Sequence, residues 1–295
     1  MIVVLGSTNT DMVISGAKIP VPGETVCGGS FMMNPGGKGA NQAVAVARLS
    51  ARRKQCLFIA KVGDDLFGRD TARRLKREGI DARLIVDKNV ASGTALILVD
   101  QKGQNCISVA LGANGTLSPG DVAPFAADIE RADALLLQLE TPLETVLWTA
   151  RTAHAKGVPV ILNPAPAAKL PRELYVCLDW ITPNETEAEF LTGVKVTDLA
   201  SAQRAERVLK RRGVAHVVIT LGAKGCYAAG RIHPCVKVKA VDTVAAGDTF
   251  NGAFVVALAE GKDVDEAVAF AQAASALAVT RPGAQASVPF RREVR

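Results

Sequence analysis

The chain has few aromatic residues and few histidines. Aromatic residues make up only 4% of its 295 residues, and the three histidines stand far apart at His154, His216 and His233. Zinc sites need ligands at close, regular spacings, so this scatter gives no indication of structural zinc. Nucleic-acid-binding surfaces usually combine basic stripes with stacking aromatics. The sequence shows neither, and we expect no nucleic-acid partner.

Paired cysteines and long apolar runs are also lacking. No two of the six cysteines form a C-x-x-C pair, and most lie in apolar, strand-like surroundings, which favours reduced core residues in a cytoplasmic protein. No apolar run approaches about 18 residues, so no membrane span is expected. The start at Met1–Gly6 lacks a basic segment and indicates a strand rather than a signal peptide.

Three common catalytic motifs are missing as well. The sequence contains no G-x-x-x-x-G-K-[ST], no G-x-G-x-x-G and no G-x-S-x-G. These absences argue against a P-loop ATPase, a Rossmann dehydrogenase and a serine hydrolase. What the chain does carry is a positive surplus, with 35 basic against 29 acidic residues and a net charge of +6. Such a surplus suits anionic ligands such as nucleotides.

Short apolar runs alternate with longer stretches of helical spacing. At 295 residues, the chain is long enough for one large α/β domain spanning residues 1–295. Its 48% of apolar residues can supply a sizeable core. The alternation predicts a central, mostly parallel sheet with helices on both faces. The expected strands are Ile2–Leu5, Leu57–Val62, Ala134–Leu137, Val158–Leu162, Trp180–Thr182 and Val217–Thr220. The expected helices include Lys38–Leu49, Arg69–Glu78, Pro142–Lys156, Ser201–Arg212 and Asp263–Val279.

Two regions break this alternation, at about residues 11–33 and 94–109. In the first, Pro20, Pro22 and Gly23 separate β-like runs; in the second, the turn at residues 100–103 separates two apolar runs. Both patterns are typical of hairpins. Two hairpins inserted into an α/β domain predict a separate small sheet.

The segment Asp242–Gly252 combines a small-residue turn with an acid. Ala245, Ala246 and Gly247 leave their backbone N–H groups accessible, and an apolar, Ala-rich run follows. If Asp248 lies in the first turn of a helix, those N–H groups and the helix dipole form an anion site beside a carboxylate. That carboxylate is then placed to accept a proton during phosphoryl transfer. The alternative is a capping Asp with no catalytic role.

A second glycine motif lies upstream, at Asn34–Gln42. Gly36, Gly37 and Gly39 allow another molecule to approach the backbone, while Lys38 and Asn41 offer donors to the oxygens of a polar ligand. The alternative here is a tight turn with solvated side chains.

Together the two motifs resemble the signatures of the ribokinase family of sugar kinases, the phosphofructokinase-B type. The resemblance runs from Val3 to about Phe290 and includes Gly6–Asp11, Pro22–Thr25, Gln138–Glu140, Asn163–Pro166, Thr182–Glu187 and Thr280–Gln285. It implies an ATP-dependent kinase that phosphorylates the 5-hydroxyl of D-ribose. It also implies that the small sheet is a lid over the sugar, and that two lids pair in a homodimer.

The resemblance assigns roles to individual residues. Asp248 is the implied catalytic base, with the backbone at Ala245, Ala246 and Gly247 as the anion hole. Asn9 and Asp11 follow the first strand, at the end where ligands bind in α/β folds. With Gly37, Lys38, Gly39, Asn41, Glu140 and Asp248 they form the implied sugar site.

The implied nucleotide site comes from later segments. Asn184 and Glu187 resemble the N-x-x-E motif that organises Mg²⁺ and phosphates, although an N-cap and a first-turn acid would look the same. The loop residues are Thr220, Gly222, Ala223, Lys224 and Gly225, together with Gly247. Gln272 stands where relatives often carry His or Asn beside the adenine, so the contact with the base is open.

A monovalent-cation site, for K⁺, is the last implied feature. Its residues contribute mostly backbone carbonyls, and they are Asp242, Val244, Ala278, Arg281, Gly283 and Ser287. Two kinds of alternative for the whole chain remain. It could act on deoxyribose, fructose or a nucleoside, or be a sugar-binding regulator without catalysis. Asn9, Asp11 and Glu140 favour a small, fully hydroxylated sugar, and the intact Asp248, Asn184 and Glu187 favour catalysis.

Overall fold

A parallel sheet forms the centre of the molecule. The computed structural model describes residues 1–52 and 54–294. Within them, seven strands are arranged in the order β11-β10-β9-β8-β1-β4-β5, and every neighbouring pair is parallel. The strands are β1 (Ile2–Leu5), β4 (Cys56–Gly63), β5 (Asp81–Asp87), β8 (Ala134–Leu137), β9 (Val160–Leu162), β10 (Trp180–Ile181) and β11 (His216–Val217).

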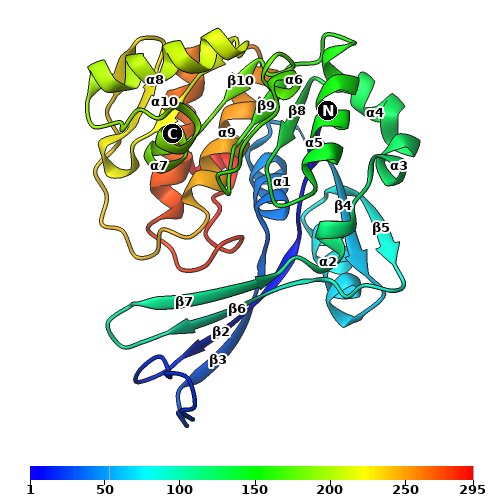
Figure 1. Ribbon diagram of the computed structural model, residues 1–295, viewed down its shortest axis with the longest axis vertical. Coiled ribbons are helices and arrows are strands. Elements are labelled where there is room, and N and C mark those ends of the chain that lie inside the picture. Colours follow the sequence, from blue (N-terminus) through cyan, green and yellow to red (C-terminus); the bar gives the residue numbers. More distant parts are fainter. Residues whose placement is uncertain (53, 295) are drawn as a thin grey trace.

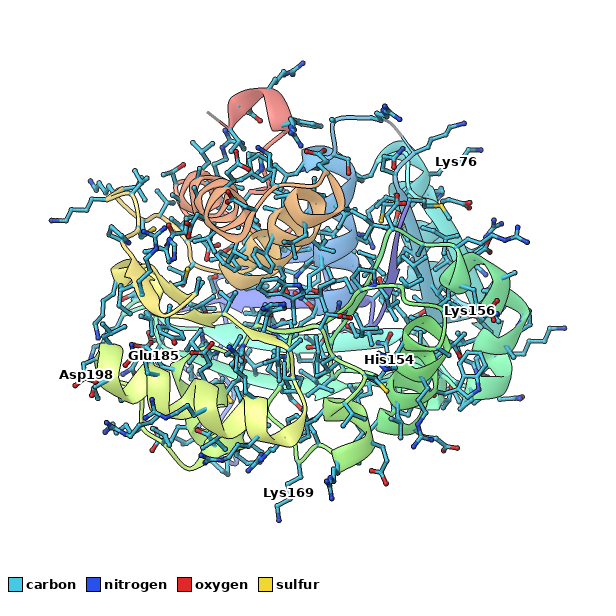
Figure 2. The ribbon with its side chains drawn as sticks, turned by 90° about the horizontal axis from the view of Figure 1, so that it is seen from above. Lys76, His154, Lys156, Lys169, Glu185 and Asp198 are labelled. Atoms are coloured by element: carbon cyan, nitrogen blue, oxygen red, sulfur yellow. The ribbon has the colours of Figure 1, made fainter. Side chains whose placement is uncertain are left out.

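Helices cover both faces of this sheet, as the alternation predicts (Figures 1 and 2). Alternate residues of a strand point to opposite faces, so Val3 and Leu5 join one apolar core and Ile2 and Val4 the other. The first core includes residues of α3 (Pro119–Val122), α4 (Ala126–Glu130), α5 (Leu143–His154), α6 (Arg172–Tyr175), α7 (Glu185–Thr192) and α8 (Leu199–Arg212). The second includes residues of α1 (Lys38–Leu49), α2 (Leu66–Arg77), α9 (Ala246–Ala259) and α10 (Val264–Ala278).

A separate four-stranded sheet projects from this body (Figure 1). Its order is β3-β2-β6-β7, with β2 and β6 parallel and the two outer pairs antiparallel. The strands are β2 (Asn9–Ser15), β3 (Ser30–Gly36), β6 (Gly93–Val99) and β7 (Asn105–Ala110). The expected small sheet is therefore present, and its strands reach a few residues beyond the expected ranges, into the body.

The structure also contains elements that the sequence pattern does not predict. The edge strand β5 carries Asp81, Arg83 and Asp87 among its apolar residues, so no continuous apolar run marks it. The run at 217–220 is divided between β11 and β12 (Ile219–Thr220). The latter joins an antiparallel sheet with β13 (Cys226–Ala228) and β14 (Arg231–His233). The 3₁₀ turns are η1 (Gly112–Thr116), η2 (Ala123–Phe125), η3 (Gly222–Lys224) and η4 (Arg291–Glu293).

Among residues 1–52 and 54–294, no helix combines the length and the apolar character that a bilayer crossing requires.

Candidate active site

The N-terminus of α9 places Asp248 in the interior. Ala245 precedes the helix in the left-handed region at φ 57°, an uncommon conformation for a residue with a side chain. The first helical N–H groups lack partners within the helix, and Ala245, Ala246 and Gly247 line a cavity. The N–H of Ala246 donates to the Thr243 carbonyl oxygen at 3.3 Å. Gly247 leaves open space beside its Cα, and Asp248 is only 7% exposed.

Two amides from α1 hold the Asp248 carboxylate. Asn41 Nδ2 donates to Oδ2 and Gln42 Nε2 donates to Oδ1, both at 2.9 Å. Burial raises the pKa of Asp248, while Lys38 and the two amide donors oppose that rise and Glu140 adds to it. Gly252 makes this approach of α1 and α9 feasible, because a Cβ there would lie 2.4 Å from the Cβ of Ala45.

Asn9 and Asp11 lie at the root of the small sheet. Asn9 is buried, and its Oδ1 accepts a hydrogen bond from Asn114 Nδ2 at 2.8 Å. Asp11 lies beside Gly36, where an added Cβ would meet the carboxylate at 2.3 to 2.5 Å. The glycine therefore leaves the room that the acid occupies. Burial and the nearby charge of Glu140 raise the pKa of Asp11 to about 6.

Glu140 and Lys38 join this group at the N-terminus of α1. Glu140 Oε2 accepts hydrogen bonds from the Lys38 backbone N–H at 2.9 Å and from the Ser7 hydroxyl. Glu140 is thus tied to the α1 N-terminus rather than fully solvated. Burial alone would lower the pKa of Lys38, but the carboxylates of Asp248, Glu140 and Glu187 outweigh burial and raise it. Lys38 is therefore a positive charge that interacts with all three of these carboxylates.

The later segments surround a cavity of about 500 Å³. Its lining unites residues far apart in sequence. It includes most of those predicted for the nucleotide, namely Asn184, Glu187, Thr220, Gly222, Gly225, Gly247 and Gln272. Lys38 and Asp248, predicted for the sugar, and Ala245 and Ala246 of the predicted anion hole line the same cavity. Of the predicted nucleotide residues, Ala223 and Lys224 are exposed on η3 and are not part of this lining in the described chain. Lys224 instead forms an exposed ion pair with Glu185 at 3.7 Å.

Asn184 and Glu187 form a capping box at the start of α7. Asn184 Oδ1 accepts from the Glu187 N–H at 2.8 Å, and Glu187 Oε2 accepts from the Asn184 N–H at 2.9 Å. Glu187 is buried at the cavity wall. Burial raises its pKa and Asp248 adds to the rise, whereas the Asn184 hydrogen bond and Lys38 oppose it. The capping interpretation thus describes the local geometry. Only Oε2 of Glu187 takes part in the capping box, so Oε1 is left out of it.

Gln272 uses its amide nitrogen within the protein. Nε2 donates to the His233 carbonyl oxygen at 2.8 Å and approaches Cys226 Sγ at 3.6 Å. Any contact with a base would therefore fall to its carbonyl oxygen. Gly225 permits the packing, because a Cβ there would lie 1.9 Å from the His233 carbonyl oxygen.

The two segments predicted for the monovalent cation are neighbours. Asp242 Oδ2 accepts from the Gly283 N–H at 2.9 Å, and Oδ1 accepts from the Val244 N–H at 3.0 Å. The Ala278 carbonyl oxygen accepts from the Arg281 N–H at 3.0 Å, and Ser287 is buried nearby in the same C-terminal segment. Asp242 therefore links the turn before α9 to the segment after α10.

Several residues of the site are absent from the sequence-based assignment. Asn114 is fully buried on η1, where it holds Asn9 and the Thr8 backbone N–H. Gln42 and Gln138 are fully buried beneath Asp248. Gln42 ends the glycine motif at Asn34–Gln42, and Gln138 begins the resembling segment Gln138–Glu140, but neither was given a role in the site. Nothing in the local pattern marks Asn114.

The fold and this site are those of a sugar kinase, and comparison with known proteins agrees. The chain belongs to the pfkB family of carbohydrate kinases, whose model matches residues 1–291. A ribokinase of Haemophilus influenzae is 48% identical over 295 residues, covering 98% of this chain and 95% of the relative. A deoxyribokinase of Salmonella typhi is 38% identical over 294 residues, covering 98% and 95%. The Arabidopsis thaliana ribokinase solved with ribose and ATP has a TM-score of 0.90 at 33% identity, covering 99% and 96%.

Proposed function

We propose that the protein is an ATP-dependent D-ribose kinase that phosphorylates the 5-hydroxyl and releases ribose 5-phosphate and ADP. The observation that carries this proposal is the position of Asp248. It lines the cavity of about 500 Å³ on one side and is hydrogen-bonded to Asn41 of the glycine motif on the other. Its carboxylate therefore lies where a sugar hydroxyl and a nucleotide phosphate would meet.

The reaction follows from this placement. Asp248 accepts the proton of the 5-hydroxyl, and the sugar oxygen attacks the γ-phosphorus of ATP in line. The O–P bond to the sugar forms as the bond to ADP breaks. Backbone N–H groups at 245–247, at the positive end of α9, stabilise the charge on the phosphoryl oxygens. No covalent enzyme intermediate is needed.

The charges around Asp248 suit a base of this kind. Burial disfavours its charged form, which increases its affinity for a proton. Lys38 and the two amide donors keep the ionised form accessible. For binding, Asp11 and Glu140 supply acceptors for sugar hydroxyls, and Asn9 both donates and accepts.

The residues of the cavity fit Mg²⁺. Glu187 and Asp248 present buried carboxylates to the cavity. Hard divalent cations prefer oxygen ligands of this kind. We assign the ion to Glu187 and Asn184, with water completing its shell. When bound, Mg²⁺ neutralises charge on the phosphates of ATP.

The donor set at Asp242 fits a monovalent cation. The Asp242 carboxylate accepts from the N–H groups of Gly283 and Val244 and so joins the two segments whose backbone carbonyls would be the oxygen ligands of such an ion. We assign K⁺ to Asp242, Val244, Ala278, Arg281, Gly283 and Ser287. Its role there is to fix the turn that precedes α9.

We further propose that the four-stranded sheet is a lid and a dimer surface of one 1–295 domain. Asp11, Ala95 and Val109 lie in one cross-strand row, so one face of the sheet continues from the sugar site. The opposite face exposes Phe31 (59%) and Met33 (54%), an apolar surface that suits a second copy of the chain.

The six free cysteines fit a cytoplasmic location.

A second candidate substrate is 2-deoxyribose, because the Salmonella deoxyribokinase is also similar over almost the whole chain. The two sugars differ by one hydroxyl. A site with Asp11 and Glu140 placed to accept hydroxyls favours the sugar that has more of them, since an acceptor left without its donor is costly. We therefore rank ribose first.

The test is ADP release with D-ribose, 2-deoxyribose, fructose and a nucleoside, each with ATP. We expect the highest kcat/KM with D-ribose. A higher value with another acceptor would replace the substrate assignment but keep the kinase. Sugar binding without ADP release from any acceptor would indicate a non-catalytic regulator.

A further inference from the structure

A buried chain of side-chain amides holds the Asp248 carboxylate. Gln42 Nε2 donates both to Asp248 Oδ1 at 2.9 Å and to Asn163 Oδ1 at 3.0 Å. Its own carbonyl, Oε1, accepts from Gln138 Nε2 at 2.6 Å. Gln42 and Gln138 are both 0% exposed. Neither side chain can touch a sugar or a nucleotide, so an effect on the reaction must pass through the residues that Gln42 holds, Asp248 and Asn163. Of these two, only Asp248 is a proton acceptor, so a change in the pH profile reports on Asp248.

The bond from Gln138 decides how Gln42 faces the base. An amide can turn either its carbonyl oxygen or its NH₂ group toward a neighbour. Because Gln138 donates to Gln42 Oε1, the NH₂ group of Gln42 is left to face two acceptors, Asp248 and Asn163. The reversed amide would set its oxygen against both of these oxygens and its nitrogen against a donor. Gln138 thereby fixes the orientation of Gln42.

The packing around Gln138 leaves it little freedom. A Cβ added to Gly6, at the end of β1, would lie 2.0 Å from Gln138 Oε1, so that position has no room for a side chain. Gln138 follows β8 directly, Gln42 lies on α1 and Asp248 on α9. The amides of Gln42 and Gln138 therefore connect Asp248 on α9, by way of α1, to the carboxyl end of β8 in the central sheet.

We propose that Gln42, oriented by Gln138, is a positioning residue that holds Asp248 in its ionised, proton-accepting form. This inference rests on the proposed kinase function and deepens it. Asn41 holds the other oxygen, Oδ2, and lies at the sugar side, so Gln42 is the donor that acts on the base without access to substrate.

The effect on ionisation has a definite direction. A donor to a carboxylate favours its charged form, and Gln42 is among the groups that lower the pKa of Asp248 against burial. The charged groups facing Asp248 are Lys38, Glu140 and Glu187. They remain in a Gln42 variant, which loses only the donor. The Asp248 pKa then rises further, and a larger share of the base is protonated at acidic pH.

The experiment measures kcat against pH at saturating sugar for the wild type, Gln42→Met and Gln138→Met. Saturating sugar keeps Asp11 engaged, so its own titration does not dominate the profile. For Gln42→Met we expect kcat to fall about tenfold at acidic pH, the scale of one hydrogen bond to a charged group. The acidic limb should move to higher pH, with recovery in alkali and little change in sugar KM. Gln138→Met should move the acidic limb of the profile in the same direction, by a smaller amount.

Thr249→Val is the matched control. Thr249 is equally buried, adjoins Asp248 on α9, and its hydroxyl has no partner among the described residues. It should keep the wild-type pH profile. Circular dichroism at each pH gives the folded fraction, and kcat divided by that fraction keeps a destabilised Gln42→Met informative. An unchanged profile in Gln42→Met, with or without uniform loss of rate, would overturn the positioning role. Absence of kinase activity in the wild type would instead refute the proposed function.

Discussion

The two halves of the cleft are built in different ways. The proposed sugar half uses side chains brought together from distant segments: Asn9 and Asp11 from β2, Lys38 and Asn41 from α1, and Glu140 after β8. The proposed nucleotide half relies largely on backbone turns, at Gly222–Gly225 and Ala245–Gly247, with the local capping box of Asn184 and Glu187.

The difference corresponds to the ligands that each half would bind. Phosphates present the same oxygens in every nucleotide, and backbone N–H groups at a helix start suffice for them. Telling one sugar from another requires hydrogen-bonding groups matched to its hydroxyls, which side chains such as Asp11 and Glu140 supply here. In the proposed sugar half, the pKa of Asp11 is raised to about 6 by burial and Glu140, which is an electrostatic cost of placing that carboxylate there. Substitutions in the two halves should therefore have separable effects.

The largest effect is expected where the halves meet. Asp248→Asn removes the proton acceptor and should lower kcat about 10²–10⁴-fold, the scale of a catalytic base. Sugar binding should persist, measured by calorimetry, with folding checked by circular dichroism. Turnover within a few-fold of the wild type would remove Asp248 from the role of base.

On the sugar side, Asp11→Ala should lower kcat/KM for ribose about 10–100-fold, as expected for a lost hydrogen bond to a charged acceptor. ATP affinity should stay close to that of the wild type. Initial-rate kinetics with each substrate varied in turn measure both. If ATP affinity fell while ribose kinetics stayed constant, the two ends of the cleft would be assigned in reverse.

On the nucleotide side, Gly247→Ala adds a methyl group to the anion hole. Among the described residues, no atom other than those of the adjoining residues and the helix's own backbone lies within 4 Å of the added Cβ. Because Ala also suits a helix better than Gly, stability should not fall. The methyl group occupies space proposed for phosphate oxygens. We expect weaker ATP binding or lower turnover by about tenfold, with ribose binding unchanged. A normal ATP KM and kcat would place the phosphates elsewhere.

The smallest expected effect is that of the cation. K⁺ between the 242–244 and 278–287 segments would set the geometry of the turn at 245–247 without touching substrate. Replacing K⁺ by Na⁺ or a bulky organic cation at constant ionic strength should lower kinase activity several-fold. Equal rates in the three salts would leave Asp242 as a structural acid that accepts from Gly283 and Val244.

How far the sequence could predict this molecule depends on how local each feature is. Helices such as Lys38–Leu49 and apolar strands such as Ile2–Leu5 follow from nearby residues, and both were predicted with correct bounds. The edge strand β5 was missed because, at the rim of the sheet, its charged residues interrupt the apolar pattern.

The site shows the same limit. Asn184 and Glu187 interact three residues apart, so their pairing is visible in sequence. The contact of Asn114 with Asn9 spans 105 residues, and that of Gln42 with Asp248 spans 206. No local pattern encodes such contacts. They appear only when the sheet and α1 bring the partners together.

The most direct test of the account is the identity of the product. Phosphorus NMR of the reaction with D-ribose and ATP should show a phosphate ester coupled to the two protons of the sugar C5, with formation abolished in Asp248→Asn. That result would place the 5-hydroxyl at Asp248, where the two halves meet. A phosphate coupled to the anomeric proton, or inorganic phosphate alone, would contradict the account.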